Sequence, residues 1–127
     1  MNENEIAREI VDAAFQVHME LGPGLLESVY ETALELELIG KGLCVSRQKS
    51  LPAIYKGVRL ELGFRTDLIV EDQVIVEIKS VELLAPVHKK QLLTYLRLAD
   101  KRLGLLINFG AALIKEGIIR IVNKLPE

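Results

Sequence analysis

Two acidic residues and a lysine stand close together in the middle of the chain. Asp67 comes ten positions before Glu77, and Lys79 follows Glu77 by two. All three lie in residues 64–80, where apolar residues alternate with polar ones. This alternation predicts two β-strands joined by a tight turn at 71–73. Because charged side chains are costly in a buried strand pair, the stretch is a candidate functional site.

The length of the turn decides which side chains face each other. A three-residue turn pairs Val70 with Val74, and therefore Asp67 with Glu77. Facing side chains on paired strands have Cβ atoms roughly 4.5–5.5 Å apart. Two carboxylates at that separation repel each other unless a cation or a proton lies between them. Lys79 would lie on the same face, about 7 Å along its strand from Glu77.

Two acids beside a lysine suit metal-assisted hydrolysis of a phosphodiester. Mg²⁺ prefers a few carboxylate oxygens together with water and phosphate oxygens. It lowers the pKa of water and neutralises charge at phosphorus. A neighbouring lysine can orient the water or stabilise the developing negative charge. The spacing alone is also found in ordinary hairpins, so a solvated strand face stays open as the alternative.

Composition favours one domain over residues 1–127. Half of the 127 residues are hydrophobic, which is enough for a core. No apolar run approaches the roughly 20 residues of a membrane span, and the start lacks the basic and apolar regions of a signal peptide. Together with a single cysteine, Cys44, these features predict a cytoplasmic protein. We expect Cys44 to be buried and unreactive.

The net charge of −2 does not indicate strong binding to nucleic acid. A local basic patch can be hidden in this sum. Five cations are candidates for such a patch: Lys89, Lys90, Arg97, Lys101 and Arg102. An ordinary solvated helix face explains the same residues equally well.

The periodicity of apolar residues predicts an α/β protein. Helices are expected over 3–21, 25–39 and 86–99, with Leu21, Leu26, Val29 and Val87 among their inward-facing residues. Strands are expected over 43–50, 52–55 and 58–63, in the central hairpin, and over 103–108, 113–115 and 118–122. The apolar run 103–108 suits a strand parallel to the hairpin after a helical crossover. The expected order is α-α-β-β-β-β-α-β-β, a mixed sheet with helices packed on it.

Several motifs in order resemble the PD-(D/E)XK nuclease superfamily. They are Asp67, then Glu77-Ile-Lys79 on the next strand, then the segments PVHKKQLLTYL and GLLINFG. Gly24-Leu-Leu-Glu27-Ser-Val-Tyr30 also matches the GxxExxY signature of a bacterial family within that superfamily. The resemblance implies a restriction-endonuclease-like fold and metal-dependent hydrolysis of DNA, or secondarily RNA. A non-catalytic module that binds nucleic acid or protein is the alternative.

The resemblance also implies a role for each matching residue. Asp67 and Glu77 would bind Mg²⁺ or Mn²⁺, together with the backbone carbonyl of Ile78. Lys79 would be the catalytic lysine, and Glu27 an accessory acid from the second helix. The remaining residues implied are catalytic Gln91, substrate-binding Lys89, Lys90 and Tyr95, and Gly24 and Tyr30 of the signature.

Some of these residues have simpler physical explanations. Glu27 suits the first turn of a helix, where a carboxylate is favoured by the helix dipole. Tyr30 suits a core aromatic whose hydroxyl is hydrogen-bonded. Thr66 stands where the superfamily has its name-giving proline. A homodimer, or a protein partner that supplies specificity, is compatible with the high apolar content.

Overall fold

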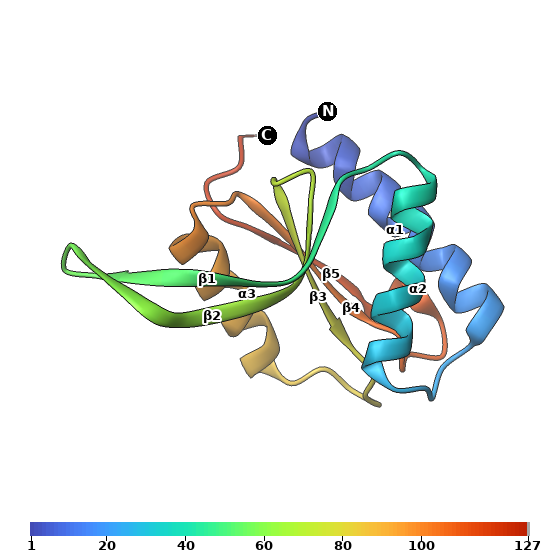
Figure 1. The fold of residues 1–127 in the computed structure, drawn as a ribbon. Helices are drawn as coiled ribbons and strands as arrows, with labels where there is room; N and C mark the ends of the chain where they lie inside the picture. Colours follow the sequence, from blue (N-terminus) through green and yellow to red (C-terminus); the bar gives the residue numbers. More distant parts are fainter. Residues whose placement is uncertain (127) are drawn as a thin grey trace.

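A single β-sheet separates two layers of helices (Figure 1). The structure is a computed structural model, which describes residues 1–126 and all of their side chains except that of Leu62. Helices α1 (Glu3–Leu21) and α2 (Glu27–Gly40) cover one face, and α3 (Pro86–Ala99) covers the other. None of the described helices has both the length and the apolar run needed to cross a bilayer.

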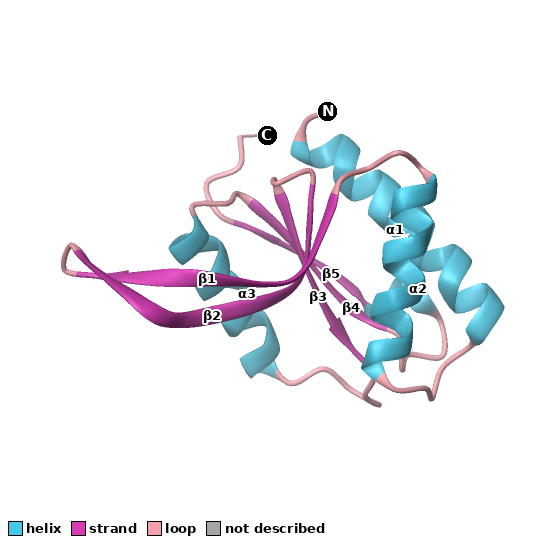
Figure 2. Cartoon of the chain, in the orientation of Figure 1, coloured by secondary structure: helices cyan, strands magenta, loops and turns pink. Residues whose placement is uncertain are grey.

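The sheet has five strands in the order in which they occur in the chain (Figure 2). They are β1 (Val45–Tyr55), β2 (Val58–Val70), β3 (Val74–Lys79), β4 (Leu103–Asn108) and β5 (Ile118–Val122). Strands β3 and β4 are parallel and are joined through α3, whereas the other neighbours are antiparallel. The mixed sheet flanked by helices and the parallel strand after a helical crossover are therefore confirmed.

Two predicted strand boundaries were wrong, so the order is α-α-β-β-β-α-β-β with a short 3₁₀ helix before the last strand. The predicted segments 43–50 and 52–55 merge into one strand, which begins at Val45, because β1 lies at the sheet edge, where Pro52 is tolerated at a bulge. Residues 113–115 are not a strand. The 3₁₀ helix Ile114–Gly117 occupies most of that segment, since it must turn the chain tightly back towards β4.

Local signals placed the helices well. The predicted limits of α1 and α3 match the structure, and α2 is shifted by one or two residues. Asn2 and Glu5 form the expected capping box, in which each side chain accepts the other residue's backbone N–H at 3.1 and 2.9 Å. The hairpin turn at 71–73 also has the predicted length, with positive φ at Glu71 and Asp72.

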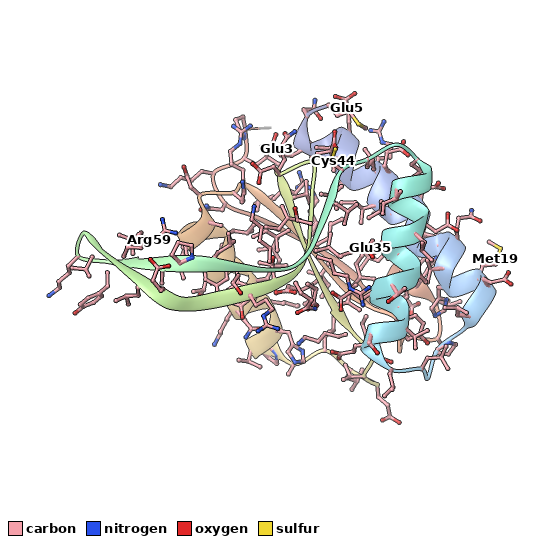
Figure 3. The ribbon with its side chains drawn as sticks, viewed as in Figure 1. Glu3, Glu5, Met19, Glu35, Cys44 and Arg59 are labelled. Atoms are coloured by element: carbon pink, nitrogen blue, oxygen red, sulfur yellow. The ribbon has the colours of Figure 1, made fainter. Side chains whose placement is uncertain are left out.

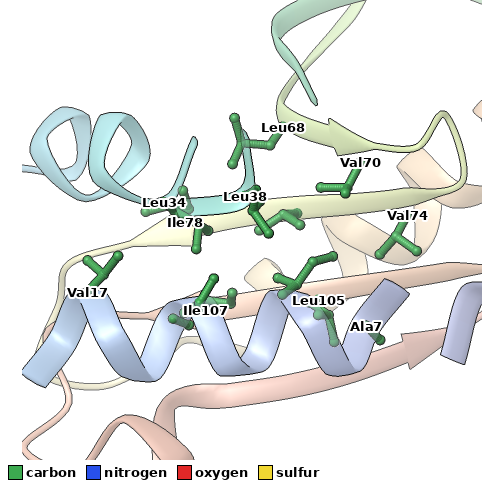
Figure 4. Packing of buried hydrophobic residues seen from close by; sticks show 14 of the residues in the cluster. Ala7, Val17, Leu34, Leu38, Leu68, Val70, Val74, Ile78, Leu105 and Ile107 are labelled. Carbon is green, nitrogen blue, oxygen red and sulfur yellow. The ribbon is translucent and has the colours of Figure 1, made fainter. Parts of the chain in front are cut away.

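The main core lies between the sheet and the helices α1 and α2 (Figure 4). Leu68, Val70, Val76 and Ile78 point into it from the central hairpin. Ile69 and Ile75 point to the opposite face and pack with Leu92 and Leu96 of α3. The period-two pattern thus assigns the apolar residues to two separate faces.

Several residues that we expected inside lie at the surface. Leu21, Leu26, Val29, Val87 and Cys44 are all exposed. Each flanks the buried stripe of its helix or lies just before a strand, so the neighbouring layer does not reach it. Helical spacing defines a broad apolar side, but the position of the partner layer decides how much of that side is covered.

Candidate active site between β2 and β3

The backbone pairing between β2 and β3 stops one step before the two acids. The ladder runs from Val70–Val74 to Leu68–Val76, and the same register places Asp67 opposite Glu77. Beyond Leu68, side chains replace the ladder. The backbone N–H of Asp67 donates to Oε2 of Glu77 at 3.0 Å. The predicted register is therefore confirmed, and both acids lie at the point where the strand pairing ends.

The hydrogen bonds at this point are reciprocal. Oδ2 of Asp67 accepts the backbone N–H of Ile78 at 2.7 Å, while Glu77 accepts that of Asp67. Each carboxylate therefore turns toward the backbone of the opposite strand, and the two meet in one gap. Burial and the charge of Asp67 raise the pKa of Glu77 to about 9, and the nearby Lys79 partly opposes this shift. Glu77 thus holds its proton at neutral pH unless a cation replaces it.

Glu27 contacts the chain directly after Lys79, at the end of β3. Lys79 is the last residue of the strand, and its carbonyl accepts the N–H of Phe109 at 2.8 Å. The next residue, Ser80, donates its backbone N–H to Oε2 of Glu27 at 3.2 Å. Its hydroxyl donates to the carbonyl of Leu25 at 2.6 Å. These contacts hold the start of α2 against the exit of the strand that carries Glu77 and Lys79.

Tyr30 stabilises the loop that leads into α2. Its ring is fully buried and stacks on Phe109 with ring centroids 4.6 Å apart. Its hydroxyl donates to the carbonyl of Gly22 at 2.5 Å and accepts the N–H of Leu25 at 3.0 Å. Gly24, between these partners, has a φ of 101°, which favours glycine. The expectation of a core aromatic with a satisfied hydroxyl is confirmed.

Comparison with known proteins agrees with this geometry. A family model described as the PD-(D/E)XK nuclease superfamily matches residues 4–121. The chain belongs to this superfamily. No curated protein matched the chain. The solved structures also contained no match. Placement in the narrower GxxExxY family stays a prediction.

Besides Asp67, Glu77 and Glu27, this superfamily member has a fourth acid at the site, Glu31, which the sequence pattern did not indicate. Glu31 lies one helical turn after Glu27 and is buried. Its Oε1 accepts a hydrogen bond from Nε2 of Gln48 at 2.6 Å. The same oxygen forms an ion pair with Nε of Arg47 at 3.3 Å. The same Gln48 nitrogen lies 3.4 Å from Oδ1 of Asp67. Gln48 thus connects an acid of α2 to an acid of β2.

The backbone of Gln48 explains how its side chain reaches both acids. Its neighbours pair as Arg47–Leu68 and Lys49–Thr66, so Gln48 lies opposite Asp67. Gln48 has a φ of 51°, a conformation that is strained for a side-chain-bearing residue inside a strand. The periodicity of apolar residues could not indicate Gln48. Glu31 had one signal in the sequence, since it lies four residues after Glu27 on the same helix and directly after Tyr30.

The residues of α3 to which the resemblance assigned roles divide between two sides of the helix. Tyr95 stacks on Phe64 of β2 with centroids 4.5 Å apart. Its pKa is raised by burial and by the charges of Glu77 and Asp67, so it lies toward the acid pair. Gln91 is one turn earlier on the same side and is exposed.

The two predicted substrate-binding lysines of α3 do not share the side of Tyr95. Lys89 lines a separate hollow with Asn108, Ala111 and Gly117. Lys90 is exposed, and helical spacing places it on the outer surface of α3. The candidate basic patch is also reduced, since Lys101 pairs with Asp72 and Arg102 with Glu3.

The donor set of this superfamily member fits Mg²⁺ or Mn²⁺. Within residues 1–126, no three His, Cys, Asp or Glu side chains gather closely enough to form a metal centre. Mg²⁺ does not need one, because it is commonly held by one or two carboxylates, with water and phosphate oxygens completing the octahedron. Asp67 and Glu77 supply that pair at one gap, and the charge of Asp67, which adds to the effect of burial in raising the pKa of Glu77, also favours a cation there.

Proposed function

We propose that this protein is a divalent-metal-dependent nuclease that hydrolyses phosphodiester bonds in DNA. The observation that carries the proposal is the reciprocal hydrogen bonding of Asp67 and Glu77 across the gap between β2 and β3, with Lys79 on the same strand. Membership of a nuclease superfamily supports the same conclusion. Because the chain contains the GxxExxY signature, we also propose that it belongs to the narrower family of that name.

Each residue has a proposed part in the reaction. Asp67, Glu77 and the carbonyl of Ile78 would hold Mg²⁺ or Mn²⁺. Bound there, the cation would supply the Lewis acidity that lowers the pKa of water and neutralises charge at phosphorus. Lys79 would orient the attacking water or stabilise the negative charge that develops on the phosphate.

Other side chains would position these groups and the substrate. Glu27 would act as an accessory acid next to Lys79, where its bond to Ser80 holds it. Gln91 and Tyr95 would contact the nucleic acid from α3.

The distribution of charge favours nucleic acid on the α3 side. Helices α1 and α2 carry nine acidic residues and one arginine, whereas α3 carries three basic residues and no acidic one. The net charge of −2 therefore conceals an uneven distribution of charge, in which Lys41, Arg47 and Arg102 neutralise part of the acidic layer. A polyanion would approach from α3, because that helix carries no acidic residue whereas the helices on the opposite face keep an excess of them.

The test is cleavage of plasmid and linear DNA with Mg²⁺ or Mn²⁺, with chelator, and with metal restored. We expect metal-dependent cleavage that falls at least about 100-fold in Asp67→Ala, because a metal ligand is lost. Glu82→Ala, which removes an exposed carboxylate after β3, is the matched control. Cleavage at the wild-type rate by Asp67→Ala would refute the mechanism. Tight DNA binding without cleavage would instead favour the non-catalytic module.

Replacement of Gln48 tests the connection between Glu31 and Asp67. Both Gln48→Ala and Gln48→Gly are expected to lower cleavage about tenfold or more, because Asp67 loses a hydrogen-bonding partner. The glycine variant should be more stable than the alanine variant by about 1 kcal/mol, since glycine accepts positive φ without strain. Denaturant unfolding measures stability, and Mn²⁺ titration measures metal affinity. Normal cleavage and metal affinity in Gln48→Gly would limit Gln48 to a structural role.

A further inference from the structure

Strands β1 and β2 continue far beyond the rest of the sheet as a two-stranded arm (Figure 1). We define the arm as residues 49–65. Its strands pair from Lys49–Thr66 to Tyr55–Val58, whereas β3 pairs with β2 only over residues 68–70. The arm therefore has no third strand. A lone two-stranded hairpin is marginally stable in water, so a feature of this length calls for an explanation.

The arm is built to project in a defined direction. Lys56 and Gly57 both have positive φ and form the tight turn at its tip. A bulge between Leu51 and Ala53 interrupts the regular pairing of the arm. Gly63 faces this bulge and leaves no room for a side chain, because a Cβ there would lie 2.1 Å from the carbonyl oxygen of Leu51. At its base, Phe64 stacks on Tyr95 of α3. The stack fixes the arm to the helix that faces the acid pair.

The surface of the arm combines positive charge with exposed apolar side chains. Its four basic residues, Lys49, Lys56, Arg59 and Arg65, outnumber one acid, Glu61, which pairs with Arg59 at 2.8 Å in an exposed ion pair. Figure 3 shows Arg59 on the arm and Glu35 on the acidic layer of α2. Four large apolar residues near the tip are 42–59% exposed: Ile54, Tyr55, Val58 and Leu60. A solvated arm explains the charges but not the apolar side chains.

We propose that the arm binds in a groove of duplex DNA held at the acid pair, a role that depends on the proposed nuclease function. A two-stranded ribbon fits the major groove, and groove-binding proteins commonly combine basic contacts with apolar wedges. The arm and α3 each carry an excess of basic residues, and β2 runs from the arm directly to Asp67. A second copy of the chain would also cover the apolar tip. A contact between two copies, however, would not explain why the arm continues β2, the strand that carries Asp67.

The length of β2 sets where the tip would contact DNA. Arg59 lies eight residues before Asp67. At about 3.3 Å per residue, Arg59 lies up to roughly 26 Å from Asp67, or about eight base pairs of DNA. The arm would therefore contact DNA to one side of the bond to be cleaved.

The experiment measures DNA binding by the full chain in an Asp67→Asn background, which keeps the duplex intact. The arm variant K56Q/R59Q is compared with R8Q/K115Q, which removes two exposed cations from α1 and the 3₁₀ helix. We expect K56Q/R59Q to weaken binding to a 30-base-pair duplex tenfold or more at about 0.1 M salt. It should also reduce the slope of log affinity against log salt by about two, one unit for each lost phosphate contact. The control should change affinity less than twofold.

A photo-crosslinker at position 55 locates the tip. Position 55 pairs with Val58, nine residues before Asp67, so the crosslinker should attach about nine base pairs from the cut made by the wild-type active site. Attachment at the cut itself, or nowhere, would overturn the proposal.

The outcomes separate the arm from the nuclease function. Metal-dependent cleavage with unchanged affinity in K56Q/R59Q overturns the arm proposal and leaves the nuclease intact. Arm-dependent binding without cleavage supports the arm and removes the nuclease. Light scattering decides the remaining case: if K56Q/R59Q dissociates a dimer without changing DNA affinity, the arm binds a second copy and the proposal is wrong.

Discussion

Replacing Lys79 with methionine is expected to lower the rate of metal-dependent DNA cleavage by about 10²–10³-fold, the range seen when one transition-state donor is removed. Methionine keeps an unbranched side chain but lacks the ammonium group. Lys79 lies two residues beyond Glu77 on β3 and is close enough to influence its pKa. Single-turnover cleavage with saturating Mg²⁺ measures the effect.

Metal binding distinguishes a chemical role of Lys79 from a structural one. The Lys79→Met protein should bind Mn²⁺ in calorimetry about as well as the wild type, because the proposed ligands Asp67 and Glu77 remain. Lys115→Met, which removes an exposed cation from the 3₁₀ helix, is the control. If Lys79→Met cleaves within tenfold of the wild type, the lysine is not the residue that stabilises the transition state.

Replacing Glu77 with glutamine is expected to stabilise the metal-free protein by several kcal/mol at pH 8 and hardly at all below pH 4.5. Burial and the charge of Asp67 raise the pKa of Glu77 from 4.5 to about 9 in the folded protein. Between these values only the unfolded chain loses the proton. This group therefore lowers the free energy of unfolding by up to about 1.4 kcal/mol for each pH unit. Glutamine has no proton to lose, so the dependence disappears.

Denaturant unfolding from pH 5 to 9 with chelator present gives the difference between the two proteins. Glu82→Gln is the control for loss of an exposed carboxylate. Added Mn²⁺ should stabilise the wild type more than Glu77→Gln, because the cation binds the folded carboxylate. A stability difference that does not change with pH would contradict the raised pKa. Equal stabilisation of both proteins by Mn²⁺ would remove Glu77 from the ligand set.

Local patterns determined most of the secondary structure and the centre of the site. The period of two in residues 64–80 assigns each apolar residue to its face, and the length of the turn sets the register that places Asp67 opposite Glu77. Capping residues determined the start of α1, and Pro86 that of α3. These features depend on residues a few positions apart, so the sequence contains the necessary information.

Contacts between distant segments decided the rest. No local pattern shows that Gln48 takes a positive φ and connects Glu31 with Asp67, because its partners come from two other elements. Nor does periodicity show that the β2–β3 ladder stops at Leu68, so that both acids turn into one gap. The free arm likewise follows from the sheet, since its other strands end before they reach it. Sequence spacing specifies which residues can face each other, and packing across the layers selects which of them meet.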